Sequence, residues 1–141
     1  MPLTYIPDPQ GPSRVRGTNP MTTADAWASI NRQASLGDWS RACLVDLRSV
    51  TWLPTPGEIR RLICQIEGLN LKHGRRGPVA FVVDGQKALF GMLRMYSILA
   101  DDIDEIDVFD NADDAIPWLA THTSRMHAAV EAPEPPGQPS A

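Results

Sequence analysis

Short apolar runs alternate with helix-like stretches along most of this chain. The runs at 42–47 and 78–83 are continuously apolar, which is typical of strands covered on both faces of a parallel sheet. Between them, apolar side chains recur every three to four positions, which predicts an amphipathic helix. Thr55 as N-cap and Glu58 three residues later form a capping box at its start.

Weaker patterns predict further elements on both sides of this centre. Strands are expected near 3–6, 13–17 and 106–109, and helices from Thr22 or Thr23 to Gly37, over 87–100 and after Asn111. Strands that alternate with helices imply right-handed β-α-β units. The sequence therefore predicts an α/β fold: a small mixed, largely parallel sheet of roughly four or five strands, flanked by about four helices.

The 141 residues suit one domain with two different ends. Residues 1–12 are rich in proline and offer at most an edge strand. Residues 13–122 carry the α/β pattern. Residues 123–141 become rich in Ala, Glu, Pro, Gly and Ser, and they are expected to form a disordered tail because they have little apolar area to bury.

Composition narrows the class of protein. No apolar run is long enough to span a bilayer, and the first residues lack the basic and apolar parts of a secretory signal, so a cytoplasmic protein is expected. Cys43 and Cys64 lie in apolar patterns and are expected to be buried, reduced thiols. No metal-ligand spacing, phosphate loop or dinucleotide motif occurs, and therefore no metal or cofactor is expected.

Charge is unevenly distributed in a chain whose net charge is −4. The segment from Asp101 to Asp114 holds eight acids and no base. It either steers a charged partner or lines solvent-exposed loops and helix starts. Lys72, His73, Arg75 and Arg76 form the sharpest basic cluster, which is expected to be a solvated turn and not a nucleic-acid site.

Five residues are candidates for a site. Asp46 ends a buried strand, where open α/β sheets bind ligands, although a carboxylate that bonds its own loop explains it too. Arg94 is a charge inside an apolar helix, and an enzyme that uses Asp46 with Arg94 is one hypothesis. Trp52 and Phe90 would line an apolar pocket or a protein-binding face, or would simply be core. Thr55 is a candidate phospho-acceptor as well as a cap.

The stretch from Leu44-Val45-Asp46-Leu47 to Gly57 resembles the strand-loop-helix of the STAS superfamily, which includes the anti-sigma-factor antagonists. Pro78-Val79-Ala80-Phe81-Val82-Val83 and Phe90-Gly91-Met92-Leu93-Arg94-Met95-Tyr96 are similar to its SpoIIAA-like (STAS/SEC14-like) branch. The resemblance implies a bacterial, non-catalytic module. Thr55 matches the phosphorylated serine of the antagonists, but Pro54 and Pro56 replace the acid and serine beside it.

These observations favour a non-enzymatic regulatory module that engages a protein partner. The first alternative is a carrier or sensor of a lipid or other small apolar ligand, and the second is the enzyme that uses Asp46 and Arg94.

Overall fold

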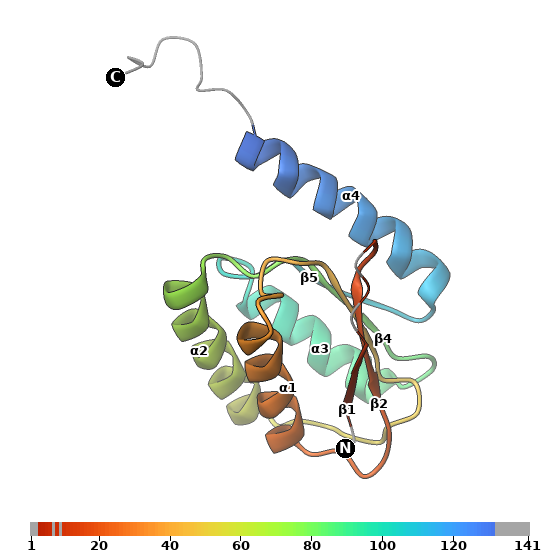
Figure 1. Cartoon of the computed structure of the whole chain (residues 1–141). Coiled ribbons are helices and arrows are strands. Elements are labelled where there is room, and N and C mark those ends of the chain that lie inside the picture. Colours follow the sequence, from red (N-terminus) through yellow and green to blue (C-terminus); the bar gives the residue numbers. More distant parts are fainter. Residues whose placement is uncertain (1–2, 7, 9, 132–141) are drawn as a thin grey trace.

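A five-stranded sheet forms the centre of the protein in a computed structural model that describes residues 3–6, 8 and 10–131 (Figure 1). Its strands lie side by side in sequence order. They are β1 (Leu3–Ile6), β2 (Ser13–Gly17), β3 (Cys43–Asp46), β4 (Val79–Val82) and β5 (Ile106–Phe109). β1 runs antiparallel to β2, and β2 to β5 are parallel. The expected mixed, largely parallel sheet is confirmed.

Helices cover the two faces of this sheet. They are α1 (Thr23–Ser35), α2 (Pro56–His73), α3 (Lys87–Leu99) and α4 (Ala112–Glu131). Each of the first three connects neighbouring parallel strands, and because such crossovers are right-handed, all three lie on the same face. α4 lies on the other face, where it packs on β3, β4 and β5 (Figure 1).

Local signals set the ends of the helices. Thr22 and Thr55 are N-caps whose side-chain oxygens accept hydrogen bonds from the backbone N–H groups of Asp25 and Glu58. Both acids accept a hydrogen bond from the backbone N–H of the cap in return, so both capping boxes are complete. After α1, Gly37 has a φ of +77°, a left-handed conformation that glycine adopts without steric cost.

Each face of the sheet has its own hydrophobic core. The larger core lies under α1, α2 and α3 and includes Leu47, Ile59 and Leu93, all 0% exposed. The smaller core lies under α4 and consists of Ala42, Leu44, Ala80, Val82, Ala115 and Leu119. Because β3 and β4 contribute to both cores, their sequences are apolar without alternation.

Two expectations change. α4 continues to Glu131 and so includes the beginning of 123–141, the segment expected to be a disordered tail; residues 132–141 lie outside the described part of the chain. Residues 123–131 contain no proline or glycine that would end a helix, and composition alone does not locate where a helix ends. Cys43 is buried as expected, but Cys64 is exposed, because it lies on the solvent side of α2.

Candidate functional site

Asp46 ends β3, and its carboxylate holds the loop that follows. Its Oδ1 accepts hydrogen bonds from the backbone N–H and from Nε of Arg48, at 3.1 and 3.0 Å, and its Oδ2 accepts one from Nη2 at 2.8 Å. These bonds to Arg48 hold the pKa of Asp46 below its usual value. Asp46 therefore has the local structural partner that the sequence left open as an alternative to catalysis.

Arg94 lies elsewhere. Its Nη1 donates a hydrogen bond to Oδ1 of Asp107 at 2.8 Å, and its side chain is half exposed. Asp107 is on β5, which β4 separates from β3, the strand that ends at Asp46. The structure therefore does not bring Asp46 and Arg94 together, and the shared pocket that the enzyme hypothesis requires is not formed.

Trp52, Thr55 and Phe90 are each held by contacts near them. The Trp52 Nε1 donates a hydrogen bond to the Thr23 hydroxyl at 3.1 Å, which ties the loop after β3 to the start of α1. The Thr55 hydroxyl accepts the Glu58 N–H at 3.2 Å as the cap of α2. Phe90 is half-buried against the larger core. Of the five candidates, Trp52 alone lines the internal cavity described below.

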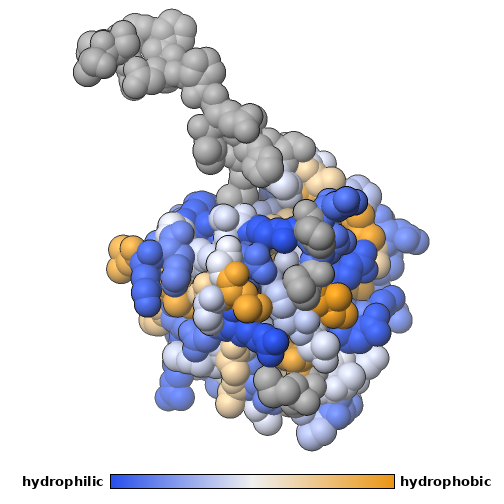
Figure 2. Space-filling view, in the orientation of Figure 1, coloured by the Kyte–Doolittle hydropathy of each residue, from blue (hydrophilic) through white to orange (hydrophobic). Residues whose placement is uncertain are grey.

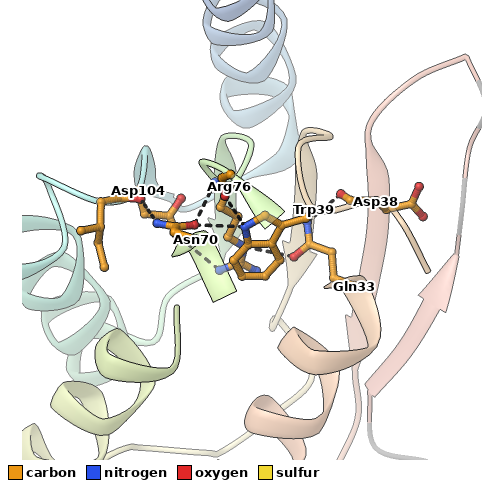
Figure 3. Close-up of polar contacts among 8 residues, drawn as sticks. Gln33, Asp38, Trp39, Asn70, Arg76 and Asp104 are labelled. Atoms are coloured by element: carbon orange, nitrogen blue, oxygen red, sulfur yellow. Dashed lines mark hydrogen bonds and ion pairs between the residues drawn. The ribbon is translucent and has the colours of Figure 1, made fainter. Parts of the chain in front are cut away.

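The basic turn before β4 is not simply solvated, because Arg76 is only 4% exposed. Its Nε donates a hydrogen bond to Oε1 of Gln33 at 3.0 Å, and its Nη1 donates one to Oδ2 of Asp104 at 3.3 Å. The guanidinium carbon lies 5.1 Å from the centre of a Trp39 ring. Figure 3 shows these groups converging from separate parts of the fold. Arg76 thus joins α1 to the loops that precede β3, β4 and β5.

Trp39 and Asn70 extend this cluster to the end of α2. The indole Nε1 of Trp39 donates hydrogen bonds to Asn70 Oδ1 at 3.0 Å and to the Gly74 carbonyl at 2.9 Å. Asn70 Oδ1 also accepts the Arg76 backbone N–H, and its Nδ2 donates to the Ile103 carbonyl (Figure 3). All these loops precede strands, so the cluster lies at the N-terminal ends of the strands, whereas Asp46 lies at the C-terminal end of β3. Ligands of open α/β sheets bind at the C-terminal ends of the strands, which favours a structural role for the Arg76 cluster.

The acidic segment is also not uniformly exposed, because Asp104 is 1% exposed. Its Oδ2 pairs with Arg76, while its Oδ1 has no hydrogen-bond partner in the described part of the chain. On the surface, Glu105 lies 3.7 Å from Arg75, and Asp107 binds Arg94. Arginines of this chain therefore neutralise part of the acidic block.

Asp104 predicts a pH-dependent stability. Burial raises its pKa to about 7, and Arg76 opposes that shift. An unfolded aspartate has a pKa near 3.9, so the folded state binds this proton more tightly. The resulting stabilisation is complete below about pH 4 and is lost as the pH rises through about 7. Relative to Asp104→Asn, we expect the wild type to lose a few kcal/mol of unfolding free energy between about pH 4 and 8.

Urea unfolding of both proteins at several pH values measures this difference. Subtracting the unfolding free energy of Asp104→Asn from that of the wild type at each pH cancels the contributions of the other titrating groups, provided that these groups behave alike in both proteins. A difference that stays constant, or that increases with pH, would show that Arg76 keeps the carboxylate ionised throughout.

An apolar cavity of about 50 Å³ lies between α1 and the sheet. Its walls include Val15, Ile30, Trp52, Leu62, Phe81 and Leu93. The lining also includes the polar side chains of Gln33, Arg76 and Tyr96. This cavity belongs to the α1–α3 face, and the loop after Asp46 contributes Leu47 and Trp52 to its lining.

A surface groove runs along α4 on the opposite face. α4 covers β3 to β5, and the side chains of the β1–β2 hairpin on that face are left exposed: Thr4, Ile6, Arg14 and Arg16. Two separate hollows make up this groove, here called the α4 trough: one is lined by Ala42, Ile116 and Leu119, and the other by Arg14, Arg16, Leu44 and Asp46. Its wider part, beside Ile116, has a volume of about 580 Å³. Ile116 is 40% exposed there because α4 does not reach β2.

Comparisons with known proteins add no assignment: no family model, no curated protein and no solved structure matches the chain. Within the described residues, no three or more His, Cys, Asp or Glu side chains are grouped to hold a metal ion. No helix in that part of the chain is both long and apolar enough to cross a membrane. Fold and site geometry are therefore the basis for a proposal.

Sequence reasoning missed both the burial of Arg76 and Asp104 and the existence of the α4 trough. Arg76 has no local signal, because charged residues in a Gly-rich turn are ordinarily solvated. The trough had a partial signal in Ser13–Gly17, where exposed arginines alternate with buried residues. Such alternation predicts a strand with one open face.

Proposed function

We propose that the protein is a non-catalytic regulatory module of the STAS type that binds a protein partner in the α4 trough. The partner would contribute an acidic, amphipathic segment. The observation that carries the proposal is the uncovered part of the sheet beside α4, where an apolar hollow and a hollow lined by arginines lie along the same face. The small mixed sheet flanked by helices is also the fold that the STAS resemblance implies.

The charges of the trough favour an acidic partner. Arg48 is paired with Asp46, whereas neither Arg14 nor Arg16 forms a salt bridge within the described residues. Both arginines alternate with buried positions on β2 and so project from the same face, where Arg16 lies across from Asp46 and helps to lower the pKa of that carboxyl. Arginine is favoured at protein interfaces because its planar group binds carboxylates through two hydrogen bonds.

The apolar part of the trough supplies the other half of the contact. Leu119 and Ala42 form a buried floor, and Ile116 stands beside them with its side chain partly in solvent. On the face seen in Figure 2, hydrophobic side chains are scattered among hydrophilic ones. A partner that covers the trough would gain moderate apolar burial and would depend on charge for orientation and specificity.

The test compares two double charge reversals. Arg14→Glu with Arg16→Glu alters the trough, and Arg60→Glu with Arg61→Glu makes the same change in net charge on exposed positions of α2. Proteins captured from host lysate by the wild type are identified, purified and titrated against each variant by calorimetry. We expect the trough variant to bind a true partner about tenfold or more weakly, a loss of at least about 1.4 kcal/mol, and the α2 variant to bind it unchanged.

A second pair of variants tests the apolar part. Ile116→Ser should weaken the same partner, whereas Leu71→Ser, at a side chain that is 92% exposed on α2, should not. Binding should also weaken as ionic strength rises. A purified partner that binds both trough variants as tightly as the wild type would refute the proposal.

A further inference from the structure

Each of the three helices on the α1–α3 face ends with a large apolar side chain that is exposed to solvent. Leu71, in the last turn of α2, is 92% exposed, and Ile98, near the end of α3, is 70% exposed. Leu36, which follows α1, and Leu99, the last residue of α3, are about half exposed. Single exposed side chains are ordinary, but a group of them marks an interaction surface.

The topology brings these side chains to one end of the molecule. Each of the three helices connects two neighbouring parallel strands, so all three run in the same direction and end beside the N-terminal ends of the strands. α2 packs against both α1 and α3 (Figure 1). The end of α2 is also bonded to the loop after α3, because Asn70 donates a side-chain hydrogen bond to the Ile103 carbonyl at 2.9 Å. The surface formed by these helix ends is here called the helix-end strip: Leu36, Leu71, Ile98 and Leu99.

Charges of both signs accompany this strip. At the ends of α1 and α2, Arg32 and Lys72 are exposed, and neither forms a salt bridge within the described residues. After α3, the same is true of Asp101 and Asp102. The strip therefore has a basic part on α1 and α2 and an acidic part beside α3.

The end of α3 lacks the cation that the other two helix ends have. The last turns of α1 and α2 contain basic residues, whereas that of α3 contains none and is followed by Asp101 and Asp102. Arg75 reaches only the backbone carbonyl of Asp102, and its carboxylate partner is Glu105. Because a helix C-terminus carries partial negative charge, a cation supplied by another molecule would stabilise this end.

We propose that a second copy of this chain covers the helix-end strip, with the two copies related by a two-fold axis. Such a pair uses the same surface twice, so Leu71 and Ile98 are buried at its centre and Lys72 of each copy lies against Asp101 and Asp102 of the other. A surface with both signs of charge is complementary to its own copy, whereas a membrane or a nucleic acid would require a basic surface. The strip belongs to the α1–α3 face, so this association does not depend on partner binding in the α4 trough.

Sedimentation velocity of the full-length protein over a range of concentrations measures the association. We expect a monomer–dimer equilibrium whose dissociation constant rises about tenfold or more in Leu71→Ser combined with Ile98→Ser, because the apolar centre is lost from both copies. Leu53→Ser combined with Ile116→Ser is the matched control and should leave the dissociation constant unchanged. Both of these side chains are exposed, but Leu53 precedes the start of α2 and Ile116 is on α4.

Charge reversal separates this contact from nonspecific association. Lys72→Glu should weaken the dimer about tenfold or more, because like charges then meet twice in the symmetric pair. Adding Asp101→Lys and Asp102→Lys to the same chain should restore the dimer, because opposite charges meet again. Lys87→Glu makes the same change in net charge at the start of α3, the other end of that helix, and should have no effect. Thermal melts by circular dichroism check that each variant is folded.

Three results would overturn the proposal. The first is a monomer at every concentration up to the limit of solubility. The second is a dimer that the folded Leu71→Ser, Ile98→Ser variant forms as tightly as the wild type, or that the control pair dissociates instead, since either would place the contact elsewhere. The third is a Lys72→Glu protein that dimerises unchanged, or whose lost dimer is not restored by reversing Asp101 and Asp102.

Discussion

Replacing Arg76 with alanine should lower the free energy of unfolding by about 3–5 kcal/mol, a large part of the stability of a small domain. The substitution leaves the buried Asp104 carboxyl without its partner and frees the side-chain amide of Gln33. It also removes the cation that lies over the Trp39 ring. Three connections among neighbouring loops are therefore lost together.

Arg75→Ala is the control for this prediction. Arg75 is the preceding residue and also faces an acid, but its side chain is 45% exposed and lies 3.7 Å from Glu105. Exposed pairs of this kind contribute about 0–1 kcal/mol. Urea denaturation of both variants measures the contrast, and equal losses of stability would show that the buried pair has no special role. Arg76→Lys should not restore stability, because an ammonium group lacks the planar fork.

Replacing Gly77 with alanine should cost about 3 kcal/mol or more, at the upper end of overpacking effects. An added Cβ would lie 2.6 Å from the Ser40 carbonyl oxygen and would also clash with the Arg41 backbone. The neighbours are backbone atoms next to β3, so they cannot rotate away as the end of a side chain does. The Gly77 N–H donates a hydrogen bond to the Trp39 carbonyl at 2.9 Å, which keeps the two loops close.

Gly68→Ala supplies the matched control, because Gly68 lies within α2 and its added Cβ would meet nothing within 4 Å. That substitution should stabilise the protein by about 0.5–1 kcal/mol through the higher helix propensity of alanine. Denaturation midpoints of the two variants should therefore move in opposite directions. A Gly77→Ala protein as stable as the wild type would mean that the loops separate at little cost.

Much of the fold was predictable because its signals are local. The capping box of Thr55 and Glu58, the glycine after α1 and the apolar run of β4 each depend on a few neighbouring residues. The continuous run at 78–83 even indicated that both faces of its strand are covered, as they are. The end of α4 was not predictable in this way, since a change in composition does not fix a helix terminus.

The candidate site was less predictable. Thr55 and Asp46 have the structural roles that their local sequence allows, as a helix cap and as the acceptor for Arg48. Whether Asp46 and Arg94 meet depends on which strands are neighbours, and in the structure these two residues do not lie together. The partner of Arg94 is Asp107, which lies thirteen positions later in the chain on β5.

The sequence by itself determined most of the secondary structure, the α/β class and the two covered strands, because periodicity and capping depend on residues within a turn or two. Only the tertiary structure decided that Arg76 and Asp104 are buried together, that Gly77 has no room for a side chain, and that β1 and β2 are left uncovered beside α4. Each of these depends on segments tens of residues apart, and their contact follows from the order of strands in the sheet. The charge pattern of a single turn carries no information about that order.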